Sequence, residues 1–221
     1  MDVQVDEPKN VTVDMIADLA CPWCYLGLVR LDKARALRPA LQVELRWWPY
    51  MLNPQLPKNG MDRRTYLRAK FGGDAKAEQI YQRIEEAGRQ EGMALAFDKI
   101  RRTPNTIAAQ RLILAAQDRG LGGAVIRTLF KAFFEDGIDI GSDDEVRRLG
   151  QAAGLPREEI DALFSGDAHS ADIIRGHQRA QMMGVQGVPV YVVDQKHVIT
   201  GAQAPEVLAG LLDVARTDGV A

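Results

Sequence analysis

The sequence predicts an α/β fold of the βαβ…ββα type with a large all-helical insertion. Three observations predict it. Two strand-like segments flank an amphipathic helix near the N-terminus, a strand hairpin followed by a helix lies near the C-terminus, and the long segment between them is helical in pattern. We therefore expect a discontinuous α/β domain, residues 1–60 and 184–221, interrupted by a helical domain of residues 61–183.

The first unit contains two expected strands and one helix. Residues 11–17 alternate and then become apolar, and residues 41–47 alternate strictly, so both predict strands. A helix is expected from about residue 25 to residue 37, ending before Pro39. This order predicts a parallel strand pair joined by a right-handed crossover. The expected apolar face of the helix consists of Leu28, Leu31, Ala34 and Leu37.

The middle segment opens with a loop over residues 49–60, which holds three prolines and two asparagines. Helical patterning follows from about residue 62 to residue 183. Two helix starts are expected there. Thr103 followed by Pro104 is typical of a cap and a first helical residue, and the run from Ser142 to Glu145 has the form of a capping box.

The last segment changes character. Residues 190–193 and 197–200 predict an antiparallel hairpin with a tight turn at residues 194–196. A final helix is expected over residues 205–216. Without the helical insertion, this order of elements is that of a minimal thioredoxin fold. The expected apolar face of the last helix consists of Val207, Leu208, Leu211, Leu212 and Ala215.

Composition excludes several classes of protein. The formal net charge is -2, so no global field favours nucleic-acid binding, and 46% of the residues are apolar, which suits a packed core. No apolar run approaches the roughly 18 residues that span a bilayer. The first seven residues are acidic and do not resemble a secretory signal. We therefore expect a soluble, cytoplasmic protein without nucleic-acid or membrane partners.

The two cysteines of the chain lie together in Cys21-Pro22-Trp23-Cys24, between an expected strand and an expected helix. Thiol–disulfide exchange needs a thiolate and a nearby second thiol. A cysteine at a helix N-terminus faces free N–H groups and the positive end of the macrodipole, which favour an anion. Pro22 suits the first helical position. We therefore expect Cys21 to be the nucleophile and Cys24, one turn further on, to be the resolving thiol.

The pair also has two other interpretations. Buried structural cysteines are common. Half of a zinc site would need further ligands, and His169, His177 and His197 show no paired ligand spacing. A C-x-x-C that follows a strand and opens a helix favours redox chemistry over both alternatives.

Nearby residues suggest further roles. Trp23 lies between the cysteines and is expected to face substrate. Trp47 and Trp48 either line an apolar groove or belong to the core. Asp18, three residues before Cys21, either accepts a proton from the resolving thiol or caps a turn.

Motifs along nearly the whole chain resemble the FrnE-like branch of the DsbA family. They occur in the family's order and are specific as a set. The motifs are Asp18-Leu19-Ala20-Cys21-Pro22-Trp23-Cys24-Tyr25-Leu26-Gly27, Trp48-Pro49-Tyr50-Met51-Leu52-Asn53-Pro54, Pro104-Asn105-Thr106, the run from Phe134 to Gly141, Gly184-Val185-Gln186-Gly187-Val188-Pro189, and Ile199-Thr200-Gly201-Ala202-Gln203.

The resemblance implies a thioredoxin-like domain interrupted by a helical domain, with cysteine-based disulfide chemistry. It implies that the Val188–Pro189 bond is cis and faces the cysteines, although a proline entering a strand is by itself typical of an ordinary turn or edge. The backbone of Val188 would then pair with an extended substrate. Besides Val188 and Pro189, the substrate-binding residues that it implies are Pro22, Trp23, Trp48, Asn53 and Asn105.

The same branch is similar to kappa-class glutathione transferases and 2-hydroxychromene-2-carboxylate isomerases. Those proteins usually carry serine at the first motif position and use bound glutathione, so Cys21 favours redox chemistry here. One departure concerns the helix after Asn105, where family members often have histidine and this chain has Gln110.

The leading hypothesis is a disulfide oxidoreductase acting on protein or small-molecule disulfides, without a bound cofactor or metal. The alternatives are a glutathione-dependent isomerase or transferase and a chaperone-like binding module. The sequence leaves open whether glutathione is a co-substrate, whether the protein is a monomer or a homodimer, and which way electrons flow. A cytoplasmic setting would favour reduction or isomerisation over oxidation.

Overall fold

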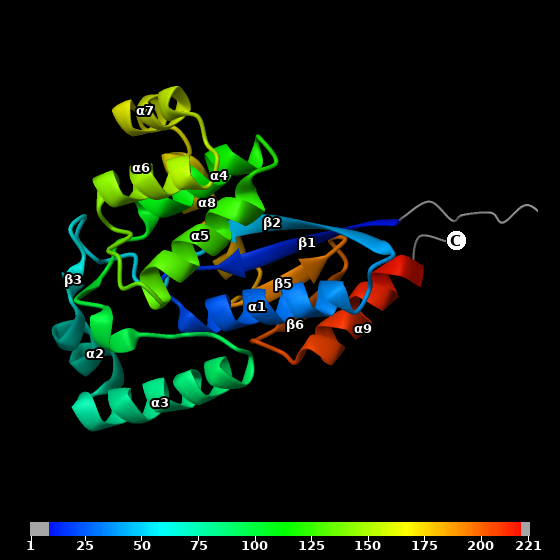
Figure 1. The fold of residues 1–221 in the computed structure, drawn as a ribbon, viewed down its shortest axis with the longest axis horizontal. Helices are drawn as coiled ribbons and strands as arrows, with labels where there is room; N and C mark the ends of the chain where they lie inside the picture. The colour runs from blue at the N-terminus through cyan, green and yellow to red at the C-terminus, as the bar shows by residue number, and fades with distance from the viewer. Residues whose placement is uncertain (1–8, 218–221) are drawn as a thin grey trace, which may run out of the picture.

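A four-stranded sheet in the order β2-β1-β5-β6 forms the centre of the computed structural model, which describes residues 9–217 (Figure 1). The strands are β1 (Lys9–Ala17), β2 (Leu41–Pro49), β5 (Val190–Val193) and β6 (His197–Thr200). β1 pairs with β2 in parallel, while β5 is antiparallel to both β1 and β6. The predicted parallel pair and C-terminal hairpin are confirmed. Residues 1–8, on which the expectation about a secretory signal rests, lie outside the described residues.

Two helices complete the α/β part. α1 (Pro22–Ala36) connects β1 to β2, and α9 (Pro205–Thr217) follows the hairpin. The two helices pack against each other, and α9 also contacts β1 and β5. In Figure 1, α1 crosses in front of the strands with α9 beside it. The βαβ…ββα order predicted from the sequence is therefore present.

The helices between β2 and β5 form two groups. α2 and α3 pack on each other, and α3 contacts α1, while α4, α5 and α8 lie against β2 with α6 and α7 outside them (Figure 1). The division at residues 61–183 stays a prediction. The bounds are α2 (Arg63–Phe71), α3 (Asp74–Gln90), α4 (Ile107–Gln117), α5 (Gly122–Phe134), α6 (Asp143–Ala152), α7 (Arg157–Ser165) and α8 (Ser170–Met182).

Short elements that the sequence did not predict lie among these helices. β3 (Met61–Asp62) pairs antiparallel with β4 (Arg102–Thr103), and the 3₁₀ helix η1 (Phe97–Lys99) precedes β4. The expected helix start at Thr103 is wrong, because the backbone of Thr103 pairs with Met61.

Two predicted helix starts have instructive outcomes. α4 begins at Ile107, whose N–H donates to Asn105 Oδ1 at 3.1 Å. The cap of α6 is confirmed, since Ser142 Oγ accepts from the Glu145 N–H at 3.5 Å. The predicted cap at Ser142 is therefore correct. The predicted cap at Thr103 is wrong, because that residue is part of a strand pair with a segment distant in the sequence.

The two α/β helices also differ in detail from the expectation. α1 begins at Pro22, three residues before the position that its apolar pattern suggested. Leu37 is 49% exposed and Val207 is 46% exposed, so neither belongs to the buried face predicted for its helix. Leu37 is the C-cap residue of α1, where the helical periodicity ends.

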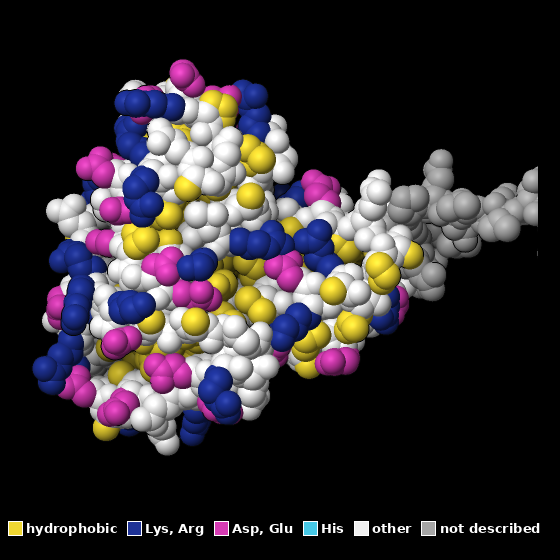
Figure 2. Space-filling model, in the orientation of Figure 1, with side chains coloured by type: hydrophobic (Ala, Val, Ile, Leu, Met, Phe, Trp, Pro, Cys, Tyr) yellow, Lys and Arg dark blue, Asp and Glu magenta, His cyan; other side chains and the backbone are white. Residues whose placement is uncertain are grey.

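The surface mixes charges of both signs. Figure 2 shows Lys and Arg interspersed with Asp and Glu over most of the face in view. Within residues 9–217, no helix is both long and apolar enough to cross a bilayer.

Candidate active site

The cysteine motif lies where β1 ends and α1 begins. The Cys21 N–H donates to the Asp18 carbonyl at 3.0 Å, which closes a turn. Cys21 is the N-cap residue with extended backbone, and Pro22 is the first residue of the helix, where a missing N–H has no cost. The Cys21 carbonyl accepts from the N–H groups of Cys24 and Tyr25 at 3.0 and 3.3 Å. The predicted position of Cys21 at a helix N-terminus is therefore what the structure has.

Both thiols are free and buried, but their surroundings differ. Cys21 Sγ points to the Val188 carbonyl, to which it donates at 3.6 Å, and the residue is 5% exposed. Cys24 is fully buried. Burial raises the pKa of the Cys24 thiol well above its ordinary value, and a hydrogen bond and the charge of Cys21 raise it further. Cys24 is therefore a neutral thiol near pH 7.

The loop before β5 brings Val188 to the cysteines. The Val188–Pro189 peptide bond is cis, and the Pro189 carbonyl accepts from the Gly201 N–H at 2.9 Å. Gly27 of α1 permits this approach. A Cβ atom at Gly27 would collide with Tyr191 Oη and would lie 3.1 Å from Pro189 Cγ.

Asp18 is buried beneath the motif. Its carboxylate accepts hydrogen bonds from the N–H groups of Ala20 and Leu52 at 3.0 and 2.6 Å and from Thr106 Oγ1 at 2.9 Å. Burial raises the pKa of Asp18, and these hydrogen bonds oppose the increase. The charge of Asp18 also raises the pKa of Cys24, which places the carboxylate within electrostatic reach of that thiol.

Asp18 shares a small cavity with the two predicted asparagines. The space open to the centre of a water molecule is about 10 Å³, which fits about one water. Asn53 Oδ1 accepts from Tyr66 Oη at 2.9 Å, and Asn105 Nδ2 donates to the Leu56 carbonyl at 3.0 Å. The structure therefore brings Asp18, Asn53 and Asn105 together, with both amides engaged in internal hydrogen bonds.

The three tryptophans have different environments. Trp23 is 38% exposed between the cysteines. Trp47 is buried, and its Nε1 donates to Gln110 at 3.2 Å. Trp48 Nε1 donates to the Gly176 carbonyl of α8 at 2.9 Å. These contacts favour the core interpretation for Trp47 and Trp48, and a substrate contact of Trp48 stays a prediction.

Gln110 links several elements around the site. This residue is fully buried, and its Nε2 donates to the Tyr50 carbonyl at 3.1 Å and to Thr106 Oγ1 at 3.0 Å. Because its Oε1 accepts from Trp47, the whole amide is used in cross-links. Gln110 is therefore a positioning residue that holds the end of β2 against α4.

Sequence reasoning missed Gly27 and Tyr191. Tyr191 is fully buried in β5, and its hydroxyl is the one buried side-chain polar atom without a hydrogen-bond partner among the described residues. Burial raises the pKa of this phenol, and the charge of Cys24 raises it further. A glycine inside a helical pattern can indicate a close approach, so Gly27 was open to detection. Nothing in the sequence around Tyr191, a residue of an apolar strand, indicated that its hydroxyl would lie near the cysteines.

Comparisons with known proteins identify the family of the chain. A family model described as a DSBA-like thioredoxin domain matches residues 12–213. The chain belongs to this DsbA-like family. The fold and family predicted from the sequence are thereby confirmed, and the chain is placed among the DsbA-like thiol–disulfide oxidoreductases. Assignment to the FrnE-like branch stays a prediction.

Individual relatives of this DsbA-like chain are distant. A crystal structure from Streptomyces coelicolor, described as a probable DsbA oxidoreductase, is 28% identical with a TM-score of 0.81, covering 94% of this chain and 90% of that one. The cytosolic disulfide reductase DsbM from Pseudomonas aeruginosa is 19% identical with a TM-score of 0.66, covering 93% and 98%. The uncharacterized protein YwbO of Bacillus subtilis is 22% identical over 90% of this chain and 94% of its own length.

Proposed function

We propose that the protein is a thiol–disulfide oxidoreductase whose Cys21 forms a mixed disulfide with substrate. The observation that carries this proposal is the position of the Cys21 thiol, at the N-terminus of α1 and 3.6 Å from the Val188 carbonyl. The helix N-terminus stabilises the thiolate that exchange requires. The neighbouring backbone offers an edge for an extended substrate.

In the reducing direction, the Cys21 thiolate attacks one sulfur of a substrate disulfide. The substrate S–S bond breaks, a Cys21–substrate disulfide forms, and the other substrate sulfur leaves as a thiolate that takes a proton. The Cys24 thiolate then attacks Cys21 Sγ, which releases the second substrate thiolate and leaves the Cys21–Cys24 disulfide. Two electrons pass from the cysteine pair to the substrate, and the same steps reversed oxidise a dithiol.

The second step requires Cys24 to lose its proton. Its raised pKa makes a nearby base useful, and the Asp18 carboxylate is the buried base within electrostatic reach. We assign Asp18 as the acceptor of that proton. The cavity beside Asp18, with room for about one water, offers a route by which the proton can then leave the carboxyl group.

A groove next to the Val188–Pro189 loop suits an extended substrate. Its volume is about 530 Å³, and its apolar lining includes Val188, Pro189 and Val198. Val198 is 59% exposed on β6, which is an edge strand of the sheet. Trp23 is exposed beside Cys21. Substrate binding by Pro22, Trp23, Val188 and Pro189 is part of this proposal.

Glutathione is the small thiol that we assign as redox co-substrate, in a cytoplasmic protein that reduces or isomerises disulfides. A structure of DsbM with bound glutathione has the same fold, at 20% identity and a TM-score of 0.63. The proposal needs no tightly bound cofactor, because the two thiols supply both electrons.

The test uses single serine variants. Cys21→Ser is expected to abolish the reduction of insulin, whereas Cys24→Ser is expected to accumulate a mixed disulfide detectable by mass spectrometry. If both variants kept full insulin-reducing activity, the proposal would be wrong. Glutathione binding and aromatic isomerase activity in Cys24→Ser, without dithiol activity in the wild type, would instead indicate a glutathione-dependent isomerase or transferase.

A further inference from the structure

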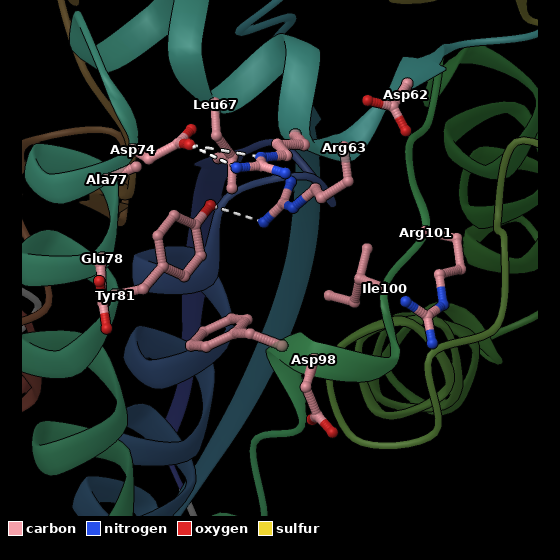
Figure 3. A pocket seen from close by; sticks show the side chains of 12 residues that line it. Asp62, Arg63, Leu67, Asp74, Ala77, Glu78, Tyr81, Asp98, Ile100 and Arg101 are labelled. Atoms are coloured by element: carbon pink, nitrogen blue, oxygen red, sulfur yellow. Dashed lines mark hydrogen bonds and ion pairs between the residues drawn. The ribbon is translucent and has the colours of Figure 1, made fainter.

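A second cavity, of about 480 Å³, lies between α2, α3 and the segment that contains η1 (Figure 3). This volume is typical of a small-molecule site. Tyr81 of α3 and Phe97 of η1 line it, with ring centroids 4.6 Å apart in an edge-on arrangement. Figure 3 shows Arg63 at the start of α2 reaching toward Tyr81, with Asp98 and Arg101 on the side formed by the η1 segment.

Arg63 is buried in the wall of this cavity, at 7% exposed. Its guanidinium donates to Tyr81 Oη at 2.6 Å and to Thr103 Oγ1 at 3.1 Å, and it lies 5.1 Å from the centroid of the Tyr81 ring. All of these partners are neutral. Within residues 9–217, no carboxylate lies at ion-pair distance from Arg63.

The other charges of the lining do not neutralise Arg63. Asp74 is exposed and pairs with Arg64 at 2.9 Å. Exposed charges are screened by water, whereas a buried cation without a counter-ion is costly. A buried cation kept at the wall of an open cavity therefore indicates an anionic ligand. The remaining charged lining residues, all exposed, are Asp62, Glu78, Asp98 and Arg101.

Ring contacts connect the cavity to the helix that carries the cysteine motif. Tyr25, next to Cys24 in the sequence, stacks on Phe134 at 6.0 Å between centroids, and Phe134 meets Phe97 at 5.9 Å. Burial raises the pKa of Tyr81, and the charge of Cys21 adds to the increase. The aromatic wall of the cavity thus continues into the ring cluster beside the reactive pair.

We infer that this cavity is a subsite for the carboxylate of a small disulfide or thiol substrate, held by Arg63, while the sulfur of that substrate reacts at Cys21. The inference rests on the proposed function. The planar guanidinium matches a carboxylate with two parallel hydrogen bonds. Tyr81 and Phe97 offer apolar surface for the chain that connects the carboxylate to the sulfur.

The test compares two small disulfides that differ in their end groups. Dithiodipropionic acid carries carboxylates, and hydroxyethyl disulfide is neutral. We expect Arg63→Met to lower kcat/KM for the diacid at least about tenfold more than for the neutral disulfide, because a charge-assisted hydrogen bond is lost. The ratio of the two values, measured on one sample, is independent of the fraction of protein that has folded.

Two further variants calibrate the ratio. Arg63→Lys keeps the charge but loses the planar fork, so we expect an intermediate ratio. Arg83→Met removes an exposed cation of α3 outside the cavity lining and is expected to leave the ratio unchanged. If Arg63→Met does not fold, the Arg63→Lys ratio decides. A ratio equal to that of the wild type overturns the subsite.

The remaining measurements distinguish failure of the proposed function from failure of the subsite. A wild type that reduces neither disulfide contradicts the proposed function. A wild type that reduces both, with equal losses in Arg63→Met, contradicts the subsite alone. Calorimetry of dithiodipropionic acid with the Cys21→Ser/Cys24→Ser variant tests binding without chemistry, and no heat at millimolar concentration overturns the subsite. A selective loss with glutathione disulfide but not with insulin supports a small substrate, and an equal loss with both overturns that assignment.

Discussion

The two sides of the α1 N-terminus are built differently. On the inner side, Cys24 is fully buried, and the Asp18 carboxylate accepts three hydrogen bonds from its surroundings. On the outer side, Cys21 faces the Val188 carbonyl next to an open groove, and Trp23 is exposed. One helical turn therefore separates a closed polar network from a surface open to substrate.

This difference supports Cys21 as the nucleophile and Cys24 as the resolving thiol more strongly than the spacing of the two cysteines does. A thiol with a raised pKa in a sealed environment is a poor first nucleophile, because the thiolate is the reactive form. The same thiol suits a second step, in which its target is Cys21 Sγ beside it. The rigid inner side then holds the geometry while substrates vary on the outer side.

The largest expected effect is a difference in alkylation between the two thiols. With iodoacetamide at pH 7, we expect Cys21 to react at least about a hundredfold faster than Cys24, since burial and a raised pKa suppress the Cys24 thiolate. Peptide mass spectrometry of native protein measures both rates. Equal rates in the native protein would contradict the comparison.

The raised pKa of Cys24 also has a consequence for stability. The folded state keeps the proton that the unfolded thiol loses near pH 9.0, so the free energy of unfolding is expected to fall as pH rises above that value. The Cys24→Ala variant lacks this thiol, so we expect its free energy of unfolding to fall less over the same pH range. Denaturant titrations of both proteins from pH 7 to about pH 10 measure the difference, and parallel curves would argue against a buried neutral thiol.

The second prediction concerns Gly27, where α1 approaches Tyr191 and Pro189 closely. We expect Gly27→Ala to destabilise the fold by about 2–3 kcal/mol, because its Cβ would collide with Tyr191 Oη and Pro189 is also close. Disulfide exchange should fall as well, since α1 must move away from the Val188–Pro189 loop. Chemical denaturation and insulin reduction measure the two effects.

The control lies in another helix. Gly210 of α9 has open space where a Cβ would be, so Gly210→Ala is expected to stabilise the protein by up to about 1 kcal/mol. Tyr191→Phe combined with Gly27→Ala should recover part of the loss, because the colliding oxygen is removed. No recovery in the double variant would show that Pro189, not Tyr191, limits the approach.

These residues show what a single sequence can and cannot predict here. The strand, motif and helix order around Cys21 follows from local periodicity and cysteine spacing, and the structure has that order. Gly27, Gln110 and Arg63 matter because of partners that are far away in the sequence. Local patterns carry no such pairing, which is also why β3 and β4 displaced the helix expected at Thr103.

The third prediction concerns the buried carboxylate. Asp18→Asn replaces one carboxylate oxygen by an NH2 group that donates. Because the N–H groups of Ala20 and Leu52 bond different oxygens, one of them then faces another donor, so we expect a loss of about 1–3 kcal/mol at pH 7 and slower release of the mixed disulfide. Stopped-flow measurement of the second step tests the kinetic part. Unchanged release would remove Asp18 from the proposed proton path.

The pH dependence of the Asp18 variant has a definite sign. The pKa of Asp18 is raised above 3.8 in the folded state, so its contribution to stability is largest below that pH and declines as pH rises through the folded pKa. The stability advantage of the wild type over Asp18→Asn should therefore narrow as pH increases from about 3.8. A gap that widens over this range would contradict the raised pKa.

The smallest effect is expected at the one polar atom of the inner side that has no partner in the described structure. Tyr191→Phe removes the buried hydroxyl without opening a large cavity, so we expect the free energy of unfolding to rise by up to about 1 kcal/mol. Because the charge of Cys24 acts on this phenol, the cysteine reduction potential should shift slightly if the hydroxyl stabilises the Cys24 thiolate during exchange. Higher stability with an unchanged potential would make Tyr191 a packing residue, whereas lower stability would show that its hydroxyl is bonded in solution and that the inner side is fully satisfied.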